Sequence, residues 1–294
     1  MIASRTELVG LLLASVACNH GDGVEAQPPG EPSLTDVRFQ SFTAQPEKAT
    51  VLPGEPLAVE VSLGNESEKP LDLDLGFDQV GAFGFRVTGP DGSSVPTSPP
   101  KPRFGLTRSG KVVIPPGEST TRLLVLNVWC STILPPGEYQ VETFLGTSGD
   151  QRRSGFSFTV AKRDDGKLAE VLSDLAGEVL DPERPLADRH HSATMLTSSR
   201  SPVAVPAIAR ILSECKDSTV RRKAILGLGR IPAVESVQAL STLALSDGGR
   251  TSESKMAAFL VYEVHDSATD AKVRAACEPV MQKIPRPAEP KAID

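Results

Sequence analysis

The sequence has no excess of basic residues. Its 294 residues include 31 Lys and Arg against 37 Asp and Glu, which gives a formal net charge of −6. Proteins that bind nucleic acid neutralise backbone phosphates with clustered positive charge. The charge balance therefore argues against nucleic acid as a partner.

Long hydrophobic runs are also missing. The apolar run near the N-terminus, residues 8–17, contains ten residues. A helix that crosses a ~30 Å hydrocarbon layer needs about 20 apolar residues, whereas a run of about ten is typical of the core of a signal peptide. The sequence therefore predicts export and no membrane-spanning helix.

The motifs of common enzymes are absent as well. The sequence contains neither a Gly-rich phosphate-binding loop nor a Gly-x-Ser-x-Gly nucleophile turn. Its four histidines are His20, His190, His191 and His265. Adjacent histidines on a helix point ~100° apart and cannot bind metal as a pair spaced by four residues does. We therefore expect no enzyme, no cofactor and no metal site, and a surface or packing role for His190 and His191.

What the sequence contains is typical of a globular, turn-rich protein. Apolar residues make up 39% and charged residues 23%, with 24 Gly and 25 Pro. This apolar fraction is close to the globular average, and the Gly and Pro content predicts many turns. The length fits two ordinary domains, since a domain usually holds about 100–200 residues.

Residues 14–18 read Ala-Ser-Val-Ala-Cys, and small residues directly before a cysteine resemble the lipobox of bacterial lipoproteins. The resemblance implies a signal peptide over residues 1–17, cleavage before Cys18 and a lipid on the Cys18 thiol. Ser15 stands where the family usually has Leu, and an ordinary secretory signal is the alternative. Asn19 replaces the Asp that favours inner-membrane retention, which implies the outer membrane in a diderm bacterium.

Residues 18–35 are rich in Gly, Pro and polar residues. A segment with so little to bury is predicted to be a flexible tether. The last ten residues, 285–294, are likewise expected to be a disordered tail.

Residues 36–162 alternate apolar and polar side chains in short runs, as at 57–63, 71–75 and 139–143. Pro-Gly turns separate the runs, and Pro-Gly-Glu precedes a run three times. This pattern predicts an antiparallel β-sandwich of about eight strands. The sequences at 135–139 and 156–160 resemble bacterial immunoglobulin-like domains of extracytoplasmic proteins.

Two features of this region invite other interpretations. Trp129 and Cys130 cannot form the tryptophan–disulfide core of antibody domains, because Cys130 is the only cysteine here. We expect Trp129 to fill the core or the end of a long strand at 122–128.

Asp72, Asp74 and Asp78 could bind Ca²⁺, but alternate Asp residues on a strand are more typical of its solvent face.

Residues 163–284 change to the helical period of 3.6, and Asp217 and Ser218 are candidate N-caps of one helix. Residues 218–224 align with 252–258, an offset of 34 residues. Such a period predicts an α-solenoid. Residues 206–228 resemble a HEAT repeat, and in that family the equivalents of Asp217 and Arg221 support packing between units.

Cys215 and Cys277 both lie on apolar stripes of this region. They could form one disulfide, but buried free thiols are the favoured interpretation. Arg221, Arg222 and Lys223, with Arg230, are expected to form a solvated helix face.

The sequence therefore predicts a multidomain β-then-α protein, an antiparallel immunoglobulin-like β-sandwich followed by a short HEAT-like α-solenoid. We expect a non-catalytic, lipid-anchored envelope protein that binds another protein. One alternative is a protease inhibitor that acts through the Pro-rich loop 93–104. A second is an enzyme on the helical region, against which the lack of an acid–base set argues.

Overall fold

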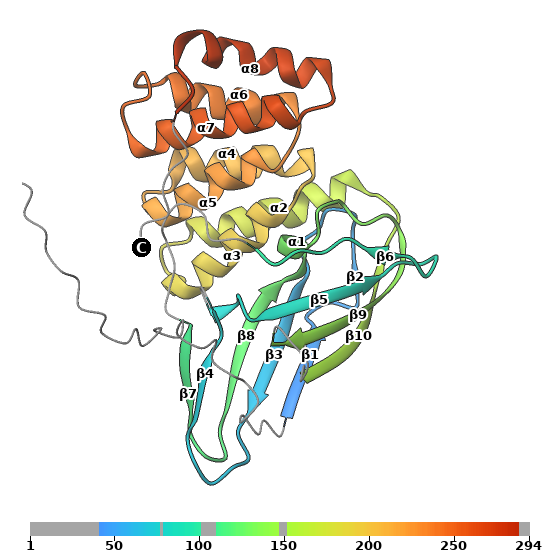
Figure 1. Cartoon of the computed structure of the whole chain (residues 1–294). Coiled ribbons are helices and arrows are strands. Elements are labelled where there is room, and N and C mark those ends of the chain that lie inside the picture. The colour runs from blue at the N-terminus through green and yellow to red at the C-terminus, as the bar shows by residue number, and fades with distance from the viewer. Residues whose placement is uncertain (1–40, 77–78, 101–109, 147–151, 288–294) are drawn as a thin grey trace, which may run out of the picture. The chain divides into compact units, whose positions relative to one another are not determined.

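The computed structural model describes residues 41–76, 79–100, 110–146 and 152–287, all within one compact unit, Leu34–Asp294. The described chain is rich in strands up to Val160 and helical from Asp165 onward (Figure 1). This order confirms the predicted change from β to α structure. Several sequence predictions lie outside the described residues: the signal peptide 1–17, Cys18, the tether 18–35, and residues 288–294 of the tail.

The strands form three hydrogen-bonded groups. The first sheet has the order β1 (Ser41–Pro46), β3 (Ala58–Gly64), β8 (Ser119–Val125). The second has the order β2 (Thr50–Val51), β10 (Arg152–Val160), β9 (Gly137–Leu145), β5 (Phe83–Thr88), β6 (Ser94–Val95). A separate ladder pairs β4 (Leu71–Asp74) with β7 (Lys111–Ile114).

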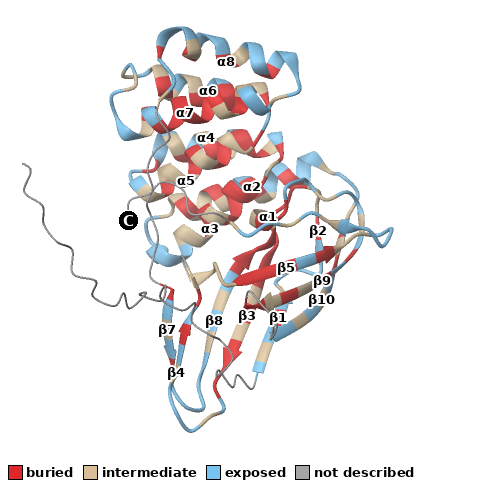
Figure 2. Ribbon diagram, viewed as in Figure 1, coloured by how far each residue is buried: buried red, intermediate tan, exposed pale blue. Residues whose placement is uncertain are grey.

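The apolar residues that alternate along the strands, as predicted, point into one shared core. Val59, Val61 and Leu63 of β3 are fully buried, and they belong to the same hydrophobic cluster as Phe85 of β5 and Val141 of β9. The two larger sheets therefore share a core. Buried residues follow β3 and β5 closely in Figure 2.

Two local details differ from the sequence predictions. The strand expected over 122–128 ends at Val125, and the chain then forms a short helix, α1 (Leu126–Trp129). The turn brings Trp129 edge-on to Phe85, with ring centroids 4.9 Å apart, so its predicted burial is confirmed. In addition, β2 pairs with β10 in parallel, not antiparallel. A long connection joins these strands, and no hairpin forces them to run in opposite directions.

The helices of the second part stand in two rows. One row contains α2 (Asp165–Leu180), α4 (Val205–Glu214), α6 (Val234–Leu245) and α8 (Ala271–Lys283). The other contains α3 (Leu186–Ser198), α5 (Ser218–Gly229) and α7 (Ser252–Ser267), and the 3₁₀ turn Pro202–Ala204 precedes α4 (Figure 1). Asp217 caps α5 through its side chain, as predicted, and Asp164 caps α2 in the same way.

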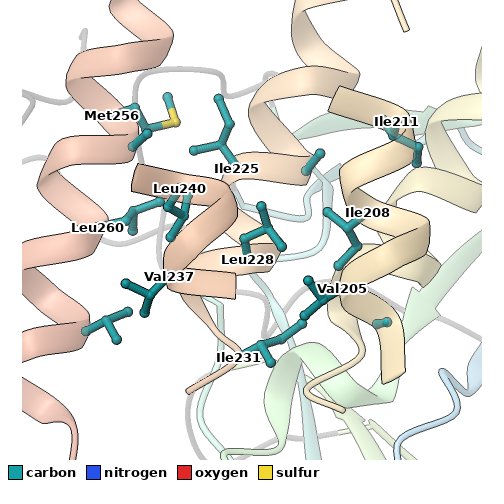
Figure 3. Packing of buried hydrophobic residues seen from close by; sticks show 14 of the residues in the cluster. Val205, Ile208, Ile211, Ile225, Leu228, Ile231, Val237, Leu240, Met256 and Leu260 are labelled. Atoms are coloured by element: carbon teal, nitrogen blue, oxygen red, sulfur yellow. The ribbon is translucent and has the colours of Figure 1, made fainter. Parts of the chain in front are cut away.

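Successive helix pairs share a continuous apolar core. Side chains of α4 to α7 point toward one another in Figure 3, where Ile208, Leu228, Leu240 and Leu260 belong to one apolar cluster. Helices α5 and α7 begin at Ser218 and Ser252, so the predicted offset of 34 residues appears in the structure. No helix among the described residues is long and apolar enough to cross a membrane.

The strand-rich and helical parts pack directly on each other. Ser199 Oγ, after α3, donates a hydrogen bond of 2.7 Å to the carbonyl of Gly54. Ala58 and Val125 form a small buried cluster with Met195 of α3. Only four residues connect β10 to α2. These contacts fix the walls of the cleft described below.

Candidate binding surfaces

A set of polar contacts links the row α3, α5 and α7. Asp217 accepts hydrogen bonds from the backbone N–H groups of Thr219 and Val220, and its other oxygen lies 3.3 Å from Nε2 of His190 in α3. Asp217 therefore caps its own helix and contacts the preceding one.

Arg221 makes the corresponding contact to the next helix. Its guanidinium donates hydrogen bonds from Nε and Nη2 to the carboxylate of Glu253 in α7, and Nη2 lies 2.7 Å from Oε2. It also donates to the carbonyl of Leu212. Lys223 donates to Thr194 Oγ1 in α3 at 2.6 Å. These contacts confirm the role between units that the HEAT resemblance implied for Asp217 and Arg221.

The four residues of the predicted solvated basic face are all only partly exposed, and Arg221 and Lys223 contact neighbouring helices. Arg221 is 22% exposed and Lys223 is half-buried, because both side chains cross to neighbouring helices. We call the contacts of Asp217, Arg221 and Lys223 the inter-helix ladder. It holds α3, α5 and α7 in a fixed register.

A cleft of about 350 Å³ lies between the strand-rich part and helices α2 and α3. Its apolar lining comes from both parts: Pro56, Leu123, Val171, Leu175 and Met195. Its polar lining is formed by Glu47, Lys48, Glu178, Arg184, Asp188, His191 and Ser192. The volume falls within the range of small-ligand and side-chain pockets, about 300–1,000 Å³.

Two contacts hold the carboxylate of Glu178 in this cleft. Ser192 Oγ donates to Glu178 Oε2 at 2.6 Å, and Arg184 Nη2 lies 3.1 Å from Oε1. Burial lowers the pKa of the nearby His191 below its usual value of 6.5, although Glu47 acts in the opposite direction. The imidazole of His191 is therefore neutral at pH 7.

The three described histidines, for which a surface or packing role was predicted, lie in different environments. His190 contacts Asp217, His191 lines the cleft, and His265 Nδ1 lies 3.2 Å from Asp266. No group of three or more His, Cys, Asp or Glu within the described ranges is placed to hold a metal ion.

Two of the aspartates considered as calcium ligands lie on β4, which pairs with β7. Asp72 and Asp74 are exposed on β4, as favoured, and Asp74 Oδ1 accepts a bond from the N–H of Gly76. Asp78 lies outside the described residues.

The cysteines Cys130, Cys215 and Cys277 are all buried and free, which confirms the favoured interpretation of Cys215 and Cys277. Burial raises the pKa of Cys277 to about 11. Burial also raises the pKa of Cys130 to about 11, against the opposing charge of Arg200. Such thiols are poor nucleophiles.

The first part of the 93–104 loop follows the edge of the second sheet. Ser94–Val95 form β6, Thr97 Oγ1 donates to the carbonyl of Phe85 at 2.7 Å, and the N–H of Ser98 donates to the carbonyl of Trp129. Residues 101–104 lie outside the described residues.

The cleft was not predicted from the sequence. One signal was present: Val171 and Leu175 are spaced by four residues, so they lie on one side of α2. The core-facing Leu168 and Leu172 are fully buried, whereas Val171 and Leu175 are only partly buried. The opposite wall could not be predicted, because Leu123 is far away in the sequence.

A family model of HEAT repeats matches residues 173–258, which extend from α2 into α7. No match was found among curated proteins. Similar solved structures include a β-glucosidase from Listeria innocua, at 16% identity over 42% of this chain and a TM-score of 0.24. The sporulation control protein Spo0M from Bacillus subtilis is 13% identical over 48% of this chain, also with a TM-score of 0.24.

This chain spans 16% of the β-glucosidase and 54% of Spo0M. Likenesses this weak carry no argument about function. The repeat match agrees with the stacked pairs in Figure 1. Residues 173–258 are therefore a HEAT-like repeat region within a helical C-terminal part.

Proposed function

We propose that this chain is a non-catalytic, lipid-anchored protein of the cell envelope that binds a protein partner. One observation carries the proposal: the HEAT-like repeats hold α3, α5 and α7 side by side through the inter-helix ladder. Stacked helix pairs present an extended surface. A surface that is already ordered loses less conformational entropy when it binds.

The proposal includes an immunoglobulin-like fold for the strand-rich part. Tyr139, near the start of β9, donates from Oη to the carbonyl of Pro135 at 2.7 Å. A tyrosine that bonds back to the preceding chain is a hallmark of that fold. The shared core of the two larger sheets agrees with it. In this interpretation the strand-rich part supports the helical surface and offers loops as a second one.

The anchor rests on residues 14–18 and their resemblance to a lipobox. Two or more acyl chains attach a protein stably, at ~0.8 kcal/mol per buried methylene. A tether over 18–35 would then keep the binding surface close to the membrane and raise its effective concentration. The variant Cys18→Ser should lose incorporation of radiolabelled palmitate and move from the membrane to the soluble fraction. Unchanged labelling would contradict the anchor.

The binding surface is tested by cross-linking in intact cells with the full chain. Arg222→Glu on α5 and Lys255→Glu on α7 change side chains outside the ladder. Each should reduce recovery of the cross-linked partner about tenfold, since reversed charge at an interface disfavours association. The matched control is Arg210→Glu, an exposed residue of α4 in the other row.

The control variant should recover the partner as wild type does. Equal losses in all three variants would show that the row is not the binding surface. If the wild-type chain forms no specific cross-link, the binding function itself is wrong.

A further inference from the structure

We propose that the cleft between the strand-rich part and helices α2 and α3 binds a peptide segment in which a Lys or Arg lies next to an apolar side chain. The cleft shares α3 with the α3–α5–α7 row, but none of the inter-helix ladder residues Asp217, Arg221 and Lys223 lines it. It would therefore give the protein a second binding site with its own chemistry.

The floor of the cleft is apolar. Met195 is buried in a cluster with Ala58 and Val125, and Leu175 packs against that cluster. Above it Leu123 of β8 keeps 41% of its surface exposed, although it lines a concave site. An aliphatic side chain of a ligand would remove this surface from water, which stabilises a complex.

The walls of the cleft carry an excess of negative charge. Glu47, Glu178 and Asp188 line it, against Lys48 and Arg184. Both cations already have partners, because Lys48 Nζ lies 2.7 Å from Glu55 and Arg184 pairs with Glu178.

Glu47 and Asp188 have no ion-pair partner within the described part of the chain, and His191 is neutral at pH 7. Both carboxylates are exposed, and a neutral, wholly apolar ligand would cover part of their hydration without compensating their charge. A cationic ligand would compensate them.

A lysine or arginine side chain can both cover apolar surface and compensate a carboxylate. Its aliphatic stem lies along apolar surface while its charged end stays near water or a carboxylate. Glu178 is already fixed by Ser192 and Arg184, so one wall is oriented before a ligand arrives. A neighbouring apolar residue of the same peptide would cover Leu123.

The probe is a fluorescein-labelled octapeptide that alternates Leu with Lys, added to the full chain and followed by fluorescence anisotropy. One matched peptide replaces Lys by Glu, and the other replaces Leu by Ser. At about 0.15 M salt, long-range attraction between exposed charges is largely screened. The Leu–Lys peptide should bind about tenfold more tightly than either control peptide, because only it meets both the floor and the walls.

Two variants then locate the site. Leu123→Ser removes the apolar wall and Asp188→Asn removes one carboxylate, and each should weaken binding of the Leu–Lys peptide about fivefold. Their matched controls are Val113→Ser, a valine 59% exposed on β7, and Asp174→Asn, an exposed residue of α2 that does not line the cleft. Both controls should bind as wild type does.

Equal affinity for all three peptides, or equal effects of the cleft and control variants, would overturn the proposal. A change in sedimentation of Leu123→Ser with unchanged peptide affinity would also overturn it, because a second copy of the chain would then cover Leu123. None of these three results affects the proposed partner surface on α3, α5 and α7, since that surface is tested with different residues.

Discussion

Two adjacent residues, His190 and His191, show how the fold gives neighbours different roles. His190 lies 3.3 Å from Asp217 and takes part in contacts between helices. His191 lies ~100° further round α3 and lines the cleft with Glu47 and Asp188. The sequence predicted that they could not share one metal, but not that each faces a different part of the molecule.

The lowered pKa of His191 predicts a pH dependence of stability. Unfolding exposes the imidazole, which then takes up a proton near its usual pKa of 6.5, whereas the folded chain takes it up only at a lower pH. Between these two pKa values the unfolded state binds more protons, so the free energy of unfolding falls as the pH falls. The stability from this group is present above pH 6.5 and is lost as the pH decreases through that window.

Urea denaturation at about pH 8 and about pH 5.5 measures this difference. His191→Gln removes the group, so the variant should lose less stability on acidification than wild type does. The difference in free energy of unfolding between His191→Gln and wild type at the higher pH measures the change in packing, which does not depend on pH. Parallel pH profiles for the two proteins would refute the prediction.

At the scale of single elements, the sequence predicted the features that depend on neighbouring residues and missed those that depend on tertiary contacts. The predicted cap Asp217 follows from side-chain chemistry within one turn, because its carboxylate accepts from the first free N–H groups of α5. The short helix α1 was missed because residues 126–129 are held by tertiary contacts, among them Trp129 against Phe85. The parallel pairing of β2 with β10 depends on residues about a hundred positions apart, which no local pattern encodes.

The pairing of Arg221 with Glu253 makes a prediction about how α5 and α7 are joined. Both side chains are 22% exposed, and two guanidinium nitrogens meet the carboxylate. A double-mutant cycle with Arg221→Gln and Glu253→Gln should give a coupling energy of ~1 kcal/mol or more, because the pair is bidentate and partly shielded from water.

The matched control is the pair Arg210 and Glu214 within α4, whose side chains are 47% and 51% exposed. Its coupling energy should be only ~0.3–0.5 kcal/mol. Thermal or urea unfolding of the wild type and of the three variants in each cycle supplies the energies. Equal coupling in the two pairs would show that the contact between helices adds nothing beyond a surface ion pair.

At the scale of the whole molecule, the order of a strand-rich part and a helical part could be predicted, but their contact could not. The bond from Ser199 to Gly54 joins residues 145 positions apart. The cleft depends on this contact, because its walls belong to the two parts. Periodicity predicts which face of an element is buried, and several packings of two parts can bury the same faces.

Gly54 tests whether this junction is tightly packed. Its φ is +85°, and a Cβ added there would lie 2.9 Å from Cβ of Ser201 and 3.8 Å from Cδ2 of Leu168. Gly92 has a similar φ of +78°, but an added Cβ would meet nothing within 4 Å. Gly54→Ala and Gly92→Ala therefore share the backbone strain of a positive φ, and only Gly54→Ala pushes the strand-rich and helical parts apart.

Gly54→Ala should consequently destabilise the fold by ~1–3 kcal/mol more than Gly92→Ala does, the range found for overpacked sites. Scanning calorimetry measures both variants and also the cooperativity of the wild-type chain. If the two parts stabilise each other through this junction, wild type unfolds in one transition and Gly54→Ala lowers its midpoint the most. Equal losses in the two variants, or two separate transitions in wild type, would mean that the parts fold independently and that the cleft has no fixed width.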